Sequence, residues 1–148
     1  MHMTPTIRIR STRARGFTLI EALVALLVLS IGLLGIASLQ LSSLRWNHGA
    51  SLRSQATLLA YDIVDRMRAN QIAAANGDYN VAFGATGSAG TVAGDDKIRW
   101  KTILASTLPG GDGSVAQVAG TQMFRIIIRW DDSRGVEAPL TFVLETQI

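Results

Sequence analysis

The chain has 148 residues, enough for one small domain, and 48 % of them are hydrophobic. It contains no cysteine and only two histidines, His2 and His48, which excludes cysteine-based metal sites and argues against a histidine-based zinc cluster. Four of the 14 Lys and Arg residues precede Gly16, whereas all 11 acidic residues follow it. The basic excess is therefore local to the amino terminus, and we do not expect direct nucleic-acid binding.

A long apolar segment follows the terminal arginines, which are Arg8, Arg10, Arg13 and Arg15. Residues 17–44 carry one charge, on Glu21, and residues 22–44 carry none. A helix rises about 1.5 Å per residue, so the uncharged run spans roughly 34 Å and can cross about 30 Å of hydrocarbon. The apolar core of an ordinary cleaved signal peptide is about half as long. We predict a membrane-spanning helix whose amino end stays in the cytoplasm, because positive charge flanks that end.

Glu21 stands out because an ionisable side chain in a spanning helix is costly and commonly marks function. A local interpretation is also open, since the helix dipole favours a carboxylate in the first turn and the side chain can reach the headgroups. Its context favours function. The string Arg15-Gly16-Phe17-Thr18-Leu19-Ile20-Glu21 resembles the prepilin signature of type IV pilin-like proteins, which follows a short basic leader.

This resemblance implies that a membrane-embedded prepilin peptidase cuts between Gly16 and Phe17 and methylates the new amino group of Phe17. It also assigns Glu21 a role in subunit assembly. A filament core of apolar helices is dry, so a carboxylate and an ammonium are each expensive there unless they pair. We hypothesise that Glu21 of an incoming subunit meets the Phe17 amine of a neighbour, and that the pair sets the axial register.

The apolar run contains Gly32 and Gly35, which are either ordinary small residues or a softer segment that allows bending or close helix packing. Many major pilins carry a helix-breaking proline at the place of Ser38, and this chain does not. That departure favours a minor pilin or a pseudopilin. His48 is expected to be exposed where the chain leaves the membrane.

The helix is predicted to continue to about Asn70, because apolar residues recur at the helical period after Leu44. This stripe consists of Leu52, Ala56, Leu59, Ala60, Ile63 and Met67. Asp62 and Arg66 are spaced as a solvated helix face prefers. Residues 72–94 are rich in Gly, Ala, Ser and Asn, and we interpret them as a long flexible connection that can carry binding specificity.

A short helix is expected after Asp95-Asp96, over residues 97–108, ended by Pro109-Gly110-Gly111. Strands are predicted over residues 114–119, 121–130 and 138–148, with a turn at 131–135. In the second strand Phe124, Ile126, Ile128 and Trp130 share one face. The fold class is therefore α+β and pilin-like, with a long amino-terminal helix packed on a small antiparallel sheet.

Few residues suggest catalysis or metal binding. Asp95, Asp96 and Asp112 could donate oxygen ligands to calcium, although helix capping by the first two and a turn at the third explain them as well. No Ser–His–Asp arrangement is credible, and Asp131 and Asp132 sit in a turn. We expect no enzyme activity, no metal and no cofactor.

The resemblance extends over most of the chain, with weaker motifs at 67–70, 108–111 and 129–132, and is closest to PilV-type minor pilins, with GspI-like pseudopilins similar. It implies a cleaved leader (1–16), a transmembrane and filament-core helix (17–45) and a periplasmic domain (46–148) in the inner membrane of a Gram-negative bacterium. The implied function is initiation or tip assembly of a type IV pilus used in twitching motility. The implied partners are other minor and major pilins, the prepilin peptidase, the inner-membrane assembly platform and the membrane. A type II secretion pseudopilin and a tip-exposed adhesive module remain alternatives.

Overall fold

The computed structural model describes residues 16–133 and 135–148. The basic leader with its four arginines therefore lies outside the described residues, apart from Gly16, and so does Arg134 in the predicted turn. The chain divides into two compact units that meet between Ser43 and Leu44. Each unit is described on its own.

One helix, α1 (Leu19–Ala69), starts in the first unit and ends in the second. Its bounds lie within two residues of the predicted ones, and it continues unbroken through Gly32 and Gly35. Every residue from 16 to 41 is exposed. Within the described residues, α1 alone is long and apolar enough to cross a membrane, with a mean hydropathy of 2.6 over its most apolar 18-residue window, none of it buried.

The serines of the apolar segment bond to the helix that carries them. The Oγ atoms of Ser30, Ser38 and Ser42 donate to the carbonyl oxygens four residues earlier, at 2.7, 3.0 and 3.1 Å. A hydroxyl satisfied in this way does not need a polar partner from outside. Apart from Thr18, Glu21, Gln40 and Ser43, the side chains of residues 17–43 therefore present an apolar surface.

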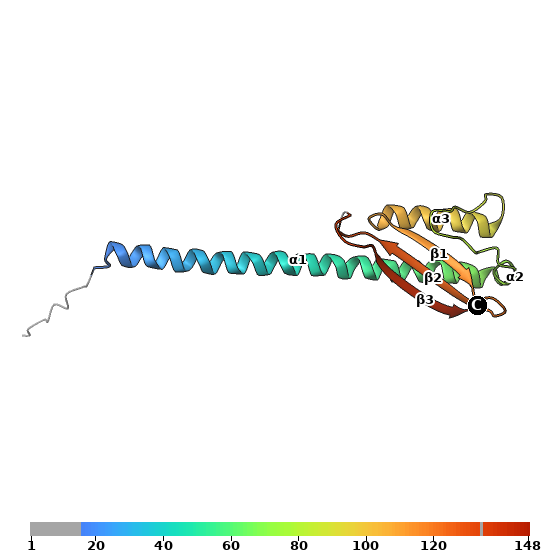
Figure 1. The fold of residues 1–148 in the computed structure, drawn as a ribbon, viewed down its shortest axis with the longest axis horizontal. Helices are drawn as coiled ribbons and strands as arrows, with labels where there is room; N and C mark the ends of the chain where they lie inside the picture. The colour runs from blue at the N-terminus through green and yellow to red at the C-terminus, as the bar shows by residue number, and fades with distance from the viewer. Residues whose placement is uncertain (1–15, 134) are drawn as a thin grey trace, which may run out of the picture. The chain divides into compact units, whose positions relative to one another are not determined.

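The second unit combines helices with a three-stranded sheet (Figure 1). Its further elements are α2 (Gln71–Ala75), α3 (Val92–Thr107), β1 (Asp112–Gln117), β2 (Met123–Trp130) and β3 (Leu140–Gln147). Both strand pairs are antiparallel, in the order β1-β2-β3. This arrangement confirms the α+β prediction, with strand ends shifted by at most two residues.

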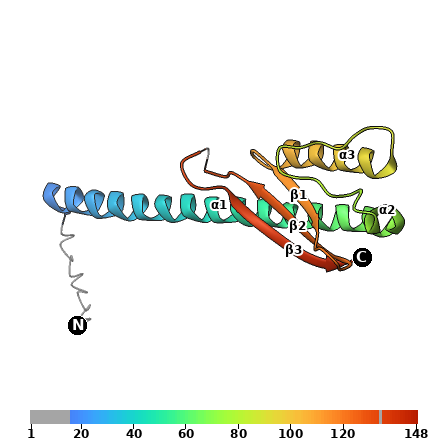
Figure 2. The same cartoon turned by 45° about the vertical axis from the view of Figure 1, so that its right-hand side comes forward.

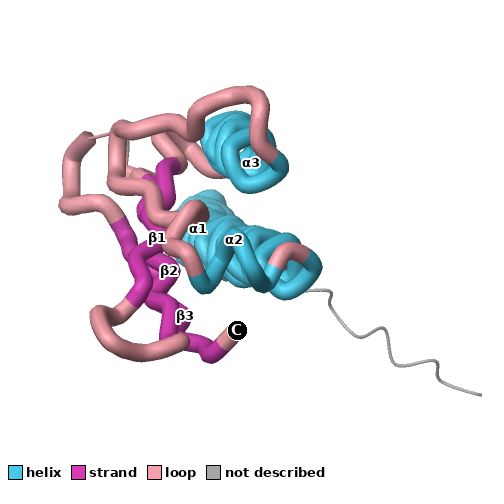
Figure 3. Tube along the Cα trace, turned by 90° about the vertical axis from the view of Figure 1, so that its right-hand side faces the viewer, coloured by secondary structure: helices cyan, strands magenta, loops and turns pink. Residues whose placement is uncertain are grey.

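The core forms where the carboxyl-terminal part of α1 packs on the sheet (Figure 3). Four of the predicted stripe residues, Ala56, Ala60, Ile63 and Met67, are fully buried, and Leu52 is nearly so. Leu59 is only partly buried, and Val64, which the stripe omitted, is buried. The predicted face of β2 supplies the opposite side of the core, with Phe124, Ile126, Ile128 and Trp130 buried.

Helix α3 (Figure 2) begins earlier than predicted, and it carries one of the two tryptophans of the core. Its N-cap is Thr91, whose Oγ1 accepts a hydrogen bond from the Gly94 N–H at 3.0 Å, so the acidic pair at 95–96 lies inside the helix rather than at its start. Trp100 is fully buried, and its Nε1 donates to the Leu59 carbonyl at 2.9 Å. A Cβ at Gly113 would overlap the Trp100 ring, so β1 approaches α3 closely at a residue without a side chain.

The glycine-rich segment 72–94 is more ordered than a flexible connection, and that prediction was wrong for much of it. It contains most of α2, and Val81 forms a two-hydrogen-bond bridge with Val115 of β1, both bonds at 2.9 Å. Tyr79 is fully buried in the core. An aromatic anchor and a short strand pairing fix the first half of this segment despite its composition.

Candidate functional site

The predicted processing and assembly residues surround the start of α1. Thr18 precedes the helix and caps it, because its Oγ1 accepts a hydrogen bond from the Glu21 N–H at 3.3 Å. Its carbonyl oxygen accepts from the N–H groups of Glu21 and Ala22 at 3.1 and 3.2 Å. The pair Thr18 and Glu21 has the spacing of a capping box, in which a Thr at the N-cap is followed three residues later by Glu. The threonine thus orients the first turn, which carries the glutamate.

Gly16, Phe17, Thr18 and Glu21 together line a shallow hollow. Phe17 is 84 % exposed, so its backbone and ring are accessible, and a Cβ at Gly16 would meet no atom within 4 Å. The three predicted site residues are therefore close together on an open surface. Thr18 was not singled out in the sequence, although the Thr-x-x-Glu spacing signals the cap.

The rest of the first unit is an uncovered apolar surface. The exposed fractions of its large side chains run from 54 % at Leu23 and Ile36 to 80 % at Leu19. Soluble proteins rarely expose apolar patches of this extent, and a helix that is apolar on all sides belongs in a membrane or inside a bundle. Such a segment needs lipid or other helices around it.

The acidic residues considered for calcium take part in separate structural contacts. Asp96 accepts hydrogen bonds from Arg66 Nη1 at 2.9 Å and from the Tyr79 hydroxyl at 2.7 Å. Arg66 also binds Asp62 at 3.0 Å, so this pair is not the freely solvated one that its spacing indicated. Burial and the bond to Asp96 raise the pKa of Tyr79 to about 12. The network joins α1, α3 and the 72–94 segment.

Asp112 is the first residue of β1 rather than part of a turn, and it pairs with two cationic side chains. Its carboxylate binds Lys101 Nζ and, at 3.4 Å, Arg129 Nη2, and it accepts the Gly84 and Gly113 N–H groups at 2.8 Å. Burial alone would raise the pKa of Asp112, but the bonds from Lys101 and the two amides outweigh burial and lower it. Among the described residues, no three His, Cys, Asp or Glu side chains come together as a metal site.

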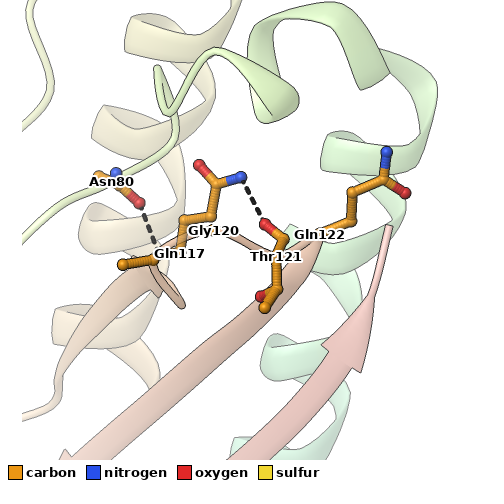
Figure 4. A pocket seen from close by; sticks show the side chains of 6 residues that line it. Asn80, Gln117, Gly120, Thr121 and Gln122 are labelled. Carbon is orange, nitrogen blue, oxygen red and sulfur yellow. Dashed lines mark hydrogen bonds between the residues drawn. The ribbon is translucent and has the colours of Figure 1, made fainter.

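A further hollow lies at the end of the β1–β2 hairpin and is lined by amides and hydroxyls (Figure 4). Asn80 Oδ1 accepts the Gln117 N–H at 2.8 Å, and Gln117 Nε2 donates to the Thr121 carbonyl at 3.0 Å. These polar groups bond to one another, and none of the residues lining the hollow is charged. The Thr121 hydroxyl donates to the Val118 carbonyl, and no lining residue of the hollow is a His, Asp, Glu or Lys that could act as its general base.

Comparison with protein families places the methylation signature on the residues described above. The family model named "Prokaryotic N-terminal methylation motif" matches residues 11–37. Comparison with curated proteins and with solved structures gave no match. The motif and the apolar helix together support a membrane-anchored type IV pilin-like protein, either a pilin or a pseudopilin, with a structural role. Such a motif implies processing by a prepilin peptidase and assembly with other pilins.

Proposed function

We propose that this chain is a minor pilin, cut between Gly16 and Phe17, that helps to initiate a type IV pilus or to build its tip. The observation that carries the proposal is the methylation motif at the head of a helix whose first 23 described residues, from 19 to 41, are all exposed. An unbroken α1 without proline favours a minor component over the main structural subunit. Membrane anchoring would place the second unit in the periplasm.

Exposure at the start of α1 suits both cleavage by the peptidase and assembly with a neighbouring subunit. A peptidase needs an accessible scissile bond, and Gly16 adds no side chain to it. Glu21 lies one turn further on, where a neighbouring subunit can approach it from solvent or lipid. In a dry filament core, its carboxylate and the Phe17 ammonium of a neighbour neutralise each other.

The first test is the amino terminus of the mature protein. Full-length protein purified from membranes of its own host is analysed by intact-mass and peptide mass spectrometry. We expect the chain to start at Phe17 with one added methyl group. Gly16→Leu should leave the uncut form, because a bulky side chain would then occupy the residue before the cut. A mature wild-type protein that keeps its leader contradicts the proposal.

The second test concerns assembly. We expect Glu21→Ala to be cut normally but to be absent from sheared pili, and Glu21→Gln to be impaired as well because it lacks the charge. The control is Glu137→Ala, which removes an exposed carboxylate in the second unit. Normal incorporation of Glu21→Ala would show that the pairing with Phe17 is not needed.

A pseudopilin of a type II secretion system is the second candidate, because an unbroken apolar helix with the same motif serves either filament. Deleting the gene separates the two. Loss of surface pili with normal exoprotein secretion supports the minor pilin, and the opposite result supports the pseudopilin. An adhesive module is less favoured, since Tyr79 and Val81 turn into the core and remove part of segment 72–94 from the surface.

A further inference from the structure

A groove begins on α1 one residue after the uncharged run ends in the sequence. Arg45, Trp46 and Arg53 of α1 line one side, and Asp132 and Leu140 line the other. The cavity volume is about 350 Å³, and all of its lining residues belong to the second unit. Gly49 also lines the groove, and a Cβ on it would lie 3.9 Å from Asp132 Oδ2. The groove is large enough for a small polar group.

The charges of this groove are not used by the fold. Neither Arg45 nor Arg53 forms an ion pair with another described residue, whereas Arg66, Arg68, Arg125 and Arg129 all do. Asp132 also has no ion pair with a described residue. Two guanidinium groups and one carboxylate thus face the same cavity. A ligand with one anionic and one cationic group would match them.

An adjoining hollow extends the groove. It shares Arg53 and Leu140 with the first cavity and reaches Trp130 and Phe142. The Trp130 Nε1 atom is buried and has no hydrogen-bond acceptor among the described residues. An unsatisfied buried donor costs about 1–3 kcal/mol. The adjoining hollow therefore adds one unsatisfied donor to the two arginines that line the pair of hollows.

The position in the sequence indicates where the ligand comes from. Trp46 is 77 % exposed, whereas Trp100 and Trp130 are fully buried. An exposed Trp next to an Arg, directly after an apolar run, is typical of the membrane–water interface, where the indole sits among headgroups. A long arginine side chain there can reach phosphate while its stem stays on apolar surface.

We propose that this groove binds the headgroup of a phospholipid that carries both a phosphate and an ammonium, such as phosphatidylethanolamine. Arg45 and Arg53 hold the phosphate through charge-assisted hydrogen bonds. Asp132 pairs with the ammonium, and Trp46 lies beside the glycerol region. The inference rests on the membrane anchoring in the proposed function. It gives the subunit a defined depth in the membrane before it enters a filament.

The test uses the full-length protein, delipidated in a mild detergent and examined by native mass spectrometry. The probes are phosphatidylethanolamine, phosphatidylglycerol, diacylglycerol and inorganic phosphate. We expect phosphatidylethanolamine to be retained about 5-fold more than phosphatidylglycerol, and diacylglycerol and free phosphate to be retained least. The double variant Arg45→Gln/Arg53→Gln should lose at least about 10-fold in retention of both phospholipids, as expected when charged hydrogen bonds are removed.

Two further variants make the test specific. Arg68→Gln/Arg99→Gln removes the same charge from exposed helical positions outside the groove and should bind like the wild type. Asp132→Asn should bind both phospholipids about equally, because it loses the partner of the ammonium. Near-ultraviolet circular dichroism of Trp100 and Trp130 checks that each variant is folded. Equal loss in the two double variants, or a preference for phosphatidylglycerol, would overturn the proposal.

Vesicle flotation separates this inference from the proposed function. Protein that floats with phosphatidylglycerol vesicles but retains phosphatidylethanolamine and phosphatidylglycerol equally keeps its anchoring and loses the groove proposal. Protein that does not float at all overturns the anchoring itself. Photo-crosslinking from position 46 in cell membranes gives a last comparison. Lipid adducts support the headgroup site, and adducts to another pilin in place of lipid overturn it.

Discussion

The two units treat apolar side chains in opposite ways. In the first unit, large aliphatic residues such as Leu34 are exposed, and the hydrogen bonds of the residues from 16 onward lie within the helix and its cap. In the second unit, Trp100, Trp130 and Tyr79 are buried among three helices and a sheet, with polar networks around them. The first unit therefore depends on its surroundings for stability, whereas the second contains its own core. Substitutions in the second unit should therefore change the free energy of unfolding. Substitutions in the first unit should change only the local order of the helix.

The largest effect on stability is expected at Trp100. Trp100→Ala removes a fully buried ring and its bond to Leu59, and such a change costs about 3–5 kcal/mol. Urea unfolding of the full chain in detergent, followed by circular dichroism, measures the loss. Trp46→Ala is the matched control and should change stability by less than about 0.5 kcal/mol, because Trp46 is exposed. Both tryptophans belong to the second unit, so similar losses would mean that burial in its core does not set their contribution to stability.

A smaller loss is expected when the Asp96 carboxylate is removed. Asp96→Asn weakens the bond to Arg66 and changes the acceptor of the Tyr79 hydroxyl, which should cost about 2 kcal/mol in the same unfolding experiment. Asp65→Asn breaks the exposed pair with Arg68 and should cost no more than about 0.5 kcal/mol. An equal cost would mean that the partly buried network stabilises no more than a surface ion pair.

The pH dependence of the second unit should reveal Asp112. Its pKa in the folded state is lowered from 3.8, so its contribution is complete above about pH 3.8 and is lost as the pH falls through the folded value. Asp112→Asn should be less stable by about 1–2 kcal/mol at pH 7, because Lys101 loses its partner. The difference from the wild type should shrink in acid. Unfolding curves from pH 7 to pH 2 test this expectation.

The control for the pH series is Asp78→Asn, which removes an exposed carboxylate. It should follow the wild-type curve throughout. A constant difference between Asp112→Asn and the wild type down to pH 2 would mean that the carboxylate does not titrate with folding.

The smallest effect is expected at the start of the first unit. Thr18→Ala removes the N-cap bond to the Glu21 N–H, which is worth about 1 kcal/mol. Amide hydrogen exchange of the full chain in detergent should be about 5-fold faster at Glu21 and Ala22, with unfolding of the second unit unchanged. Thr18→Ser keeps the hydroxyl and should exchange like the wild type. Unchanged exchange in Thr18→Ala would show that the cap does not hold the first turn.

The elements with regular periodicity could be predicted from the sequence. The 3.6-residue stripe after Leu44 and the alternation in β2 both matched the structure, because each pattern records one face packed on a core. The start of α3 was predicted too late because Asp95-Asp96 resembles a helix cap. The true N-cap is Thr91, and its capping bond depends on the local backbone conformation. The order in segment 72–94 was hidden because one buried Tyr79 determines it within an otherwise loop-like composition.

The candidate sites also differ in whether the sequence alone could predict them. Gly16, Phe17 and Glu21 could be proposed from a contiguous string, and the family comparison supports the motif that contains them. The groove at Arg45 and Arg53 could not, because Asp132 lies about eighty residues away along the chain and only the fold brings it to α1. The bond from Arg66 to Asp96 has the same origin, since 30 residues separate the partners.

The hydrogen bonds of the α1 serines to their own helix affect how easily surrounding lipid can be replaced by other helices. With Ser30, Ser38 and Ser42 turned back onto their own backbone, every side chain between them except Gln40 makes non-directional van der Waals contacts. Acyl chains and aliphatic side chains can then replace each other along the helix without breaking these serine hydrogen bonds. Movement of this stretch from lipid to neighbouring helices therefore breaks no serine hydrogen bond, and the charged residues that limit the movement lie at its two ends, Glu21 and Arg45.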